Sequence, residues 1–157
     1  MEPEPVAQII GRTLELLPLP PPDADEQGSL QPQIQAALDQ SLKAVFPQRR
    51  FIVTTSVGGK AKPNLRLLGT SFWPDLEIAD GDRLLAAIEV KVVRPGNSPS
   101  KAIAEAIGQS LVYSIRYPRV FAFIVNFGHS DDRYHNEDAG IIKQLHQLNI
   151  ELMLRRP

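Results

Sequence analysis

The chain has 157 residues, of which 43% are hydrophobic and 22% charged, a composition typical of one folded globular domain. Its formal net charge of −1 argues against tight, non-specific DNA binding, and the absence of cysteine excludes disulfides, zinc–thiolate sites and thiol catalysis. No apolar run is long enough to span a membrane and no signal peptide is recognisable, so we expect a cytoplasmic protein with no membrane partner.

The first 28 residues are expected to form an N-terminal arm. Residues 6–17 have the apolar spacing of a short helix, and residues 18–28 are a proline- and acid-rich run. Such a run fits neither a helix nor a central strand, so we expect an extended connector. Three outcomes stay open for the arm: it packs on the domain, on a second copy of the chain or a partner protein, or on nothing.

Residues 29–157 are expected to form the domain itself, which opens with an amphipathic helix. The apolar spacing predicts this helix over residues 29–45, with Ser29 as its N-cap. A strand is expected at residues 51–57, and a short extended piece at residues 65–68 follows a glycine-rich basic loop.

Residues 71–93 are predicted to form a β-hairpin around the turn Asp80-Gly81-Asp82, because Asp-Gly between two apolar runs favours a tight turn. The second strand, residues 84–93, is apolar except for Glu89 and Lys91, which point to the same side because they are two residues apart. Burying unpaired charges is costly, so this pair needs a partner that neutralises it.

A divalent cation held jointly with Asp75 would supply that partner. A two-residue turn places Asp75 on the face of the hairpin away from Glu89 and Lys91, whereas a three-residue loop places it on their face. A shared site therefore requires a three- or five-residue loop, or a β-bulge.

The rest of the chain alternates helices and strands. We expect a helix at residues 101–117, a fully buried strand at 120–126, a polar loop at 127–138, a helix at 139–148 and a last strand at 150–154. This order predicts an α/β protein, a three-layer α/β/α sandwich with a mixed central sheet.

Pro74-Asp75, followed after a short hairpin by Glu89-Val90-Lys91, resembles the signature of the PD-(D/E)xK nuclease superfamily. The predicted order of elements from residue 29 to 154 is similar to that of its restriction-endonuclease-like fold. The resemblance implies a metal-dependent nuclease that hydrolyses phosphodiester bonds, with DNA as the expected substrate.

The resemblance also implies roles for these residues. Asp75 and Glu89 would hold Mg²⁺, or Mn²⁺ as a substitute, and the Val90 carbonyl would add a third oxygen. Lys91 would orient or deprotonate the attacking water, or hold the scissile phosphate. The alternative for Glu89 and Lys91 is a charged pair on an edge strand.

Four polar residues are spaced by four along the helix at residues 101–117: Lys101, Glu105, Gln109 and Tyr113. Gln109 and Tyr113 resemble the Q-x-x-x-Y element that several branches of the superfamily carry on this helix. In that resemblance Gln109 positions Lys91 or a phosphate. The alternative is a solvated stripe, and a Lys101–Glu105 ion pair would belong to it.

One feature departs from the family pattern. Many members carry a further Glu on the first core helix, whereas residues 29–45 offer only Asp39 and the glutamines Gln31, Gln33, Gln35 and Gln40. Either Asp39 or a glutamine substitutes, or the site binds a single ion with lower affinity.

Two further groups of residues are candidates for binding. Arg49, Arg50, Lys60, Lys62 and Arg66 form the most basic region, which is either a contact to the phosphate backbone or a solvated loop. His129, Asp131, Asp132, His135 and Asp138 could bind a transition metal, but their spacing fits no standard pattern and favours a polar loop.

Two rival functions stay open beside the nuclease. The first is an inactive nuclease-fold subunit that serves as an interaction module in a defence, recombination or mobile-element complex. The second is a protein of the same fold that handles RNA or a nucleotide. A homodimer is compatible with each of them.

Overall fold

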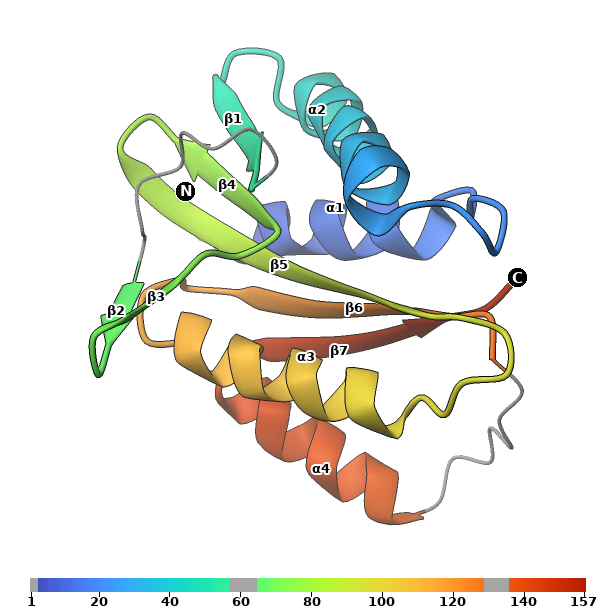
Figure 1. Cartoon of the computed structure of the whole chain (residues 1–157). Coiled ribbons are helices and arrows are strands. Elements are labelled where there is room, and N and C mark those ends of the chain that lie inside the picture. The colour runs from blue at the N-terminus through green and yellow to red at the C-terminus, as the bar shows by residue number, and fades with distance from the viewer. Residues whose placement is uncertain (1–2, 57–64, 129–135) are drawn as a thin grey trace.

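The computed structural model describes residues 3–56, 65–128 and 136–157 (Figure 1). The helices are α1 (Pro3–Leu16), the short π-helix η1 (Glu26–Leu30), α2 (Gln31–Val45), α3 (Ser100–Tyr113) and α4 (Asn136–Gln147). The strands are β1 (Phe51–Thr55), β2 (Leu65–Leu67), β3 (Thr70–Phe72), β4 (Leu76–Asp80), β5 (Arg83–Val93), β6 (Val120–Asn126) and β7 (Ile150–Arg155).

A five-stranded sheet in the order β1-β4-β5-β6-β7 forms the middle layer. Helices α1 and α2 cover one face and α3 and α4 the other (Figure 1). Strands β1, β4 and β5 are antiparallel, whereas β5, β6 and β7 are parallel. The predicted α/β/α sandwich with a mixed sheet is therefore confirmed. Every residue of β6 is buried, as its apolar sequence predicts for a strand covered on both faces.

Helix α1 packs on the domain, which is one of the three outcomes left open for the N-terminal arm. Its buried residues Val6, Ile10 and Leu14 belong to the same hydrophobic cluster as residues of α2, β5 and β6. The Arg155 guanidinium at the end of β7 donates hydrogen bonds to the carbonyls of Leu14 and Leu17. Because the last turn of α1 contains no basic residue, Arg155 supplies the cation that the helix C-terminus favours.

The start of the first domain helix differs from the prediction. Ser29 is not the N-cap, because Asp25 takes that place and accepts a hydrogen bond from the Gly28 N–H at 2.7 Å. The chain becomes helical at Glu26, three residues before the predicted start, so the extended connector ends at Asp25. A short aspartate side chain that caps free N–H groups starts the helix inside the acid-rich run.

Other boundaries shift by a few residues. Helix α3 ends at Tyr113 instead of residue 117, since three turn residues precede the Tyr117-Pro118 pair and proline disfavours a helical residue before it. Strand β1 ends two residues early, α4 begins three residues early, and β7 extends to Arg155. None of the helices in the described ranges is long and apolar enough to cross a membrane.

The β4–β5 hairpin contains the bulge that a shared Asp75–Glu89 site requires. Its turn is the two-residue Gly81-Asp82, because Asp80 pairs with Arg83. The register shifts by one residue between Ile78 and Ala79. Leu76, the first residue of β4, is therefore opposite Ile88. The bulge therefore does what a three-residue loop would have done: it places Asp75 on the side of the sheet that Glu89 occupies.

Candidate functional site

Glu89 and Lys91 lie on β5, the central strand of the sheet. Strand β5 pairs with β4 as far as Ile88 and with β6 from Ala87 to Val93, so Glu89 and Lys91 lie on a central strand and not on the edge strand that the alternative interpretation assumed. Glu89 is only 2% exposed. A carboxylate this deeply buried needs partners that offset its desolvation.

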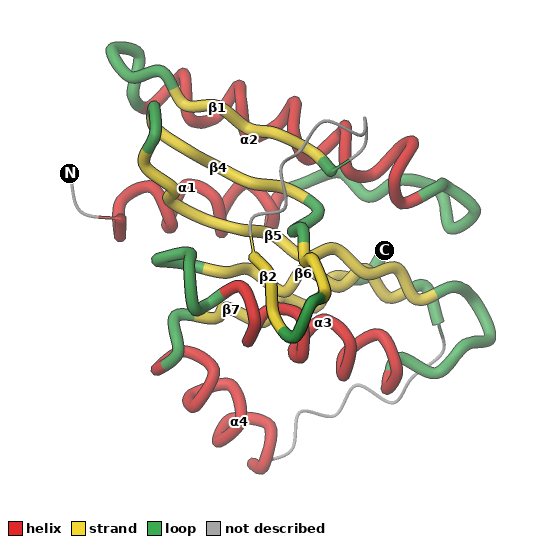
Figure 2. Tube along the Cα trace, turned by 60° about the vertical axis from the view of Figure 1, so that its left-hand side comes forward, coloured by secondary structure: helices red, strands yellow, loops and turns green. Residues whose placement is uncertain are grey.

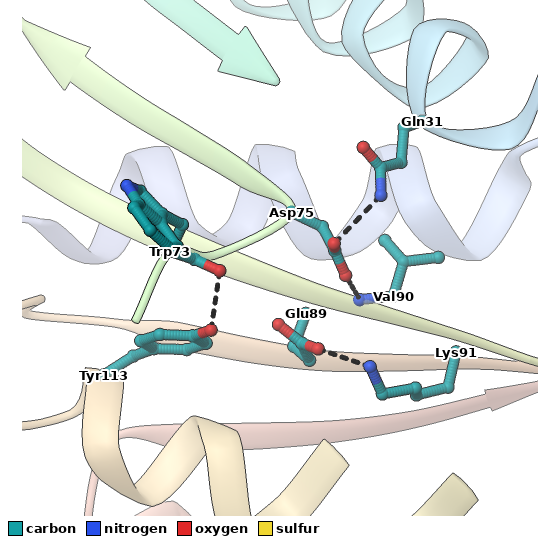
Figure 3. Close-up of polar contacts among 7 residues, drawn as sticks. All are labelled: Gln31, Trp73, Asp75, Glu89, Val90, Lys91 and Tyr113. Carbon is teal, nitrogen blue, oxygen red and sulfur yellow. Dashed lines mark hydrogen bonds and ion pairs between the residues drawn. The ribbon is translucent and has the colours of Figure 1, made fainter. Parts of the chain in front are cut away.

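Strand β5 extends beyond its pairing with β4, and the stretch of β5 that lacks this neighbour positions the site. Because β4 begins at Leu76, opposite Ile88, the N–H groups of Val90 and Val92 face an edge of β5 that none of the described strands covers. The Asp75 Oδ2 atom accepts a hydrogen bond from the Val90 N–H at 2.7 Å (Figure 3). The Val92 N–H lowers the pKa of Glu26, so the Glu26 carboxyl group lies near this same edge. In a strand the N–H and C=O of one residue face the same side, so the Val90 carbonyl also faces this edge.

Asp75 is fixed from two elements. Besides its bond to Val90, its Oδ1 atom accepts a hydrogen bond from the amide of Gln31, the fully buried first residue of α2, at 2.9 Å. Burial raises the pKa of Asp75, although these hydrogen bonds and the charge of Lys91 oppose the increase. Of the glutamines on the first helix, Gln31 therefore contacts the predicted site.

Glu89 and Lys91 form a close ion pair, with Lys91 Nζ 2.6 Å from Glu89 Oε1 (Figure 3). The other carboxylate oxygen, Oε2, is buried and accepts no hydrogen bond from any residue that the structure describes. Burial, followed by the charge of Asp75, raises the pKa of Glu89 to about 7. Burial alone would lower the Lys91 pKa, but the contact with Glu89 and the charges of Asp75 and Glu26 raise it. Lys91 is therefore a cation here and not a free base.

Glu26 is the site residue that sequence reasoning missed. Burial and the charge of Asp75 raise its pKa, while Lys91 and the Val92 N–H lower it, so its carboxylate lies within the same electrostatic cluster. Asp39, by contrast, is exposed on α2, and only partial burial raises its pKa. The available signal was Asp25, an N-cap residue type directly before Glu26, but the prolines around it favoured an extended connector.

Tyr113 of α3 contacts the segment that carries Asp75. Its hydroxyl donates a hydrogen bond to the Trp73 carbonyl at 2.7 Å, which fixes the segment that leads into Asp75 (Figure 3). Burial and the charges of Glu89 and Asp75 raise the pKa of Tyr113, so the hydroxyl stays protonated and can act as a donor. Gln109 lies one turn earlier and is half-buried, and within the described ranges its buried Oε1 atom has no hydrogen-bond partner.

The two N-terminal residues of the stripe on α3 are solvated, as the alternative interpretation expected. Lys101 and Glu105 form an exposed ion pair with a separation of 3.8 Å between Nζ and Oε1. The functional interpretation of the stripe therefore rests on Gln109 and Tyr113 alone.

The structure does not bring the predicted basic residues together at the site. Arg49 forms an ion pair with Asp80 and lies 5.0 Å above the Phe51 ring, at the turn end of the β4–β5 hairpin, and Arg50 is its exposed neighbour. Arg66 is exposed on β2. Lys60 and Lys62 lie outside the described residues, as do His129, Asp131, Asp132 and His135 of the proposed transition-metal cluster; Asp138 is in the first turn of α4.

The oxygen atoms at this site are of the type that a hard divalent cation binds. They are not arranged as a ready metal cage. Asp75, Glu89 and Glu26 offer carboxylate oxygens, the type that Mg²⁺ and Mn²⁺ prefer, and one buried Glu89 oxygen has no hydrogen-bond partner in the described part of the chain. Over the described ranges, however, no three or more His, Asp or Glu side chains converge as a ready metal cage. The reason is visible in the contacts: Val90, Gln31 and Lys91 occupy the other oxygens.

Comparisons with known proteins give no relative for this chain. No family model matches it, and neither does any curated protein or any solved structure. Its function is therefore inferred from the fold and from the geometry of this carboxylate–lysine cluster.

Proposed function

We propose that this protein is a metal-dependent nuclease with a restriction-endonuclease-like fold that hydrolyses phosphodiester bonds, with DNA as its substrate. The observation that carries the proposal is the buried Glu89 carboxylate, which has one oxygen on Lys91 and the other without a hydrogen-bond partner among the described residues. Two further carboxylates, Asp75 and Glu26, lie beside it and raise its pKa. Such a concentration of buried negative charge favours binding of a cation.

Asp75, Glu89 and the Val90 carbonyl would hold the metal, as the family resemblance implies, and Glu26 would add a carboxylate. When bound, Mg²⁺ or Mn²⁺ supplies an activated water and charge stabilisation for the phosphate. Lys91 holds a positive charge at the edge of the cluster, where it can bind a phosphate oxygen or orient the water. Tyr113 keeps the Trp73-Pro74-Asp75 segment in place through the Trp73 carbonyl.

The test is cleavage of plasmid and single-stranded DNA with Mg²⁺ or Mn²⁺. We expect Glu89→Gln and Lys91→Ala each to lower the rate by about 100-fold or more, since each removes a charge that acts on the reacting phosphate or its metal. Glu105→Gln is the matched control, because it removes an exposed carboxylate outside the site and keeps the wild-type rate. Metal-independent cutting, or equal rates in all variants, would contradict the proposal.

A second candidate function is an interaction module that has the nuclease fold but does not cut. The observation that favours it is the engagement of the carboxylates by protein groups, above all the Gln31 amide on Asp75. The two functions differ in metal binding: a nuclease releases or absorbs heat when Mn²⁺ is titrated in, and an inactive module with a closed site does not.

A further inference from the structure

The β2–β3 hairpin stands off the main sheet beside the point where β4 begins (Figures 1 and 2). Leu68 and Gly69 form its tip, and both have positive φ, as a two-residue hairpin turn of type I′ requires. Its base is anchored: Phe72 packs against the hydrophobic cluster that contains Tyr113, and Tyr113 holds the carbonyl of Trp73. The hairpin is therefore a fixed projection next to Asp75.

The two faces of this hairpin differ in chemistry. Leu65 pairs with Phe72, whose side chain is directed toward the core, whereas Arg66 pairs with Ser71 on the opposite face. Trp73 directly follows β3 and precedes Pro74, and proline favours an extended backbone in the residue before it. Side-chain alternation in such a backbone places Trp73 on the face of Arg66 and Ser71. Arg66 is exposed, and Trp73 is 43% exposed although tryptophan is normally well buried. In Figure 3 the Trp73 ring turns away from Asp75 and Glu89.

An exposed indole beside an exposed guanidinium matches the chemistry of unpaired nucleotides. The indole face stacks on a base that is not already paired within a duplex, and the arginine neutralises a phosphate. Trp73 is two residues from Asp75, so the two Cα atoms are at most about 7 Å apart. A base on Trp73 would thus belong to a nucleotide close to a phosphate at the carboxylate cluster.

We propose that the Arg66–Ser71–Trp73 face of the β2–β3 hairpin binds single-stranded DNA next to the scissile phosphate, with Trp73 stacked on an unpaired base. This inference rests on the proposed nuclease function and names its substrate class: unpaired strands, flaps or junction ends in preference to uniform duplex. The hairpin selects the strand, and the carboxylate cluster acts on its backbone.

Trp73 is the only tryptophan of the chain, so its fluorescence reports on this face directly. The wild-type protein is titrated in EDTA with a single-stranded oligonucleotide of about 12 nucleotides, a length within the usual range for single-strand sites. The same titration is made with the corresponding duplex. We expect quenching that saturates with the single strand, at an affinity at least about 10-fold above that for the duplex. Unchanged emission, or equal affinity for both forms, overturns the inference.

Variants separate stacking from charge, with binding followed by the anisotropy of a labelled oligonucleotide. Trp73→Leu keeps an apolar side chain but loses the aromatic face, and we expect an affinity loss of about 5- to 150-fold, with Trp73→Phe recovering part of it. Arg66→Gln should reduce the slope of log K against log salt by about 0.7, whereas Lys43→Gln, an equal charge loss on the exposed side of α2, leaves it unchanged. Equal effects of Arg66→Gln and Lys43→Gln would contradict a phosphate contact at the hairpin.

Because these measurements need neither metal nor turnover, their failure differs from failure of the nuclease proposal. Metal-dependent cleavage without preference for single strands in binding refutes the hairpin inference and leaves the nuclease intact. Selective binding without cleavage refutes the nuclease and leaves the single-strand face intact.

Discussion

At the scale of single residues, the fold disfavours the charged form of the Glu89 carboxyl group. Its carboxyl group is 2% exposed, and burial together with Asp75 raises its pKa from an ordinary value of 4.5 to about 7. Between these two pH values the folded protein keeps a proton that the unfolded chain has released. The free energy of unfolding therefore falls as the pH rises through this window and levels off above pH 7.

We accordingly predict that the metal-free protein is more stable at pH 5 than at pH 7.5. The full shift of the Glu89 pKa corresponds to at most about 3–4 kcal/mol. Asp75 and Glu26 have raised pKa values as well and act in the same direction. Urea unfolding in EDTA at both pH values measures the effect, and Glu89→Gln should show a smaller loss than wild type. Identical pH dependence in the two proteins would show that Glu89 is ionised without penalty in the fold.

At the scale of secondary-structure elements, α1 is part of the core and not a detachable arm. Leu14 is fully buried in the cluster shared with α2 and the sheet, and Arg155 on β7 bonds to its carbonyl. We predict that Leu14→Ala lowers the free energy of unfolding by about 2–5 kcal/mol, because it removes buried methyl groups and leaves a cavity. The matched control is Leu16→Ala, where the side chain is 67% exposed and the loss should stay below about 0.5 kcal/mol.

Urea unfolding of the two variants decides between the two descriptions of the arm. A loss confined to Leu14→Ala places α1 in the cooperative core, as the contacts indicate. Equal small losses in both variants would mean that the helix unfolds separately from the domain, as the extended-arm interpretation of the first 28 residues allowed.

At the scale of the whole molecule, the layered fold was predictable because its determinants are local. The apolar run of β6, the apolar period of α2 and the Asp-Gly turn each specify an element through neighbouring residues, and their order along the chain limits the architecture to a few choices. The sequence also predicted what a shared site of Asp75 and Glu89 requires. Strand alternation puts the two side chains on one side of the sheet only if the hairpin has a longer loop or a bulge. Which of the two occurs depends on packing along β4 and β5, and the turn sequence alone does not decide it.

The rest of the site depends on contacts between segments far apart in the sequence. Glu26 reaches the Val92 N–H only because α1 and the connector bring η1 to the open edge of β5. No local pattern marks that approach, and the surrounding prolines indicate an extended chain. Gln31 was one of several glutamines on one helix, and its contact with Asp75 follows from the position of α2 over the sheet. The positions of η1 and α2 relative to the sheet thus complete the site, and a sequence motif does not reveal them.

Metal binding at the proposed site would make the stability of the whole protein depend on the metal. A ligand that binds only the folded state adds about 2.7 kcal/mol at 100 times its Kd, and for a domain of this size each kcal/mol raises Tm by roughly 2–4 °C. We predict that Mn²⁺ at that excess raises the Tm of the wild-type protein by about 5–10 °C relative to EDTA, as measured by differential scanning calorimetry.

Variants of Glu26 and Asp39 test whether this increase in Tm comes from the proposed metal site. Glu26→Gln should bind Mn²⁺ about 10-fold more weakly, because it removes a carboxylate from the cluster, and so should lose about half of the Tm increase at the same Mn²⁺ concentration. Asp39→Asn should keep the full increase, since Asp39 is exposed on α2 and only its partial burial affects its pKa. A loss in Asp39→Asn equal to that in Glu26→Gln would assign the metal to the outer face of α2. An unchanged wild-type Tm would favour the non-catalytic module, in which Lys91 alone balances Glu89.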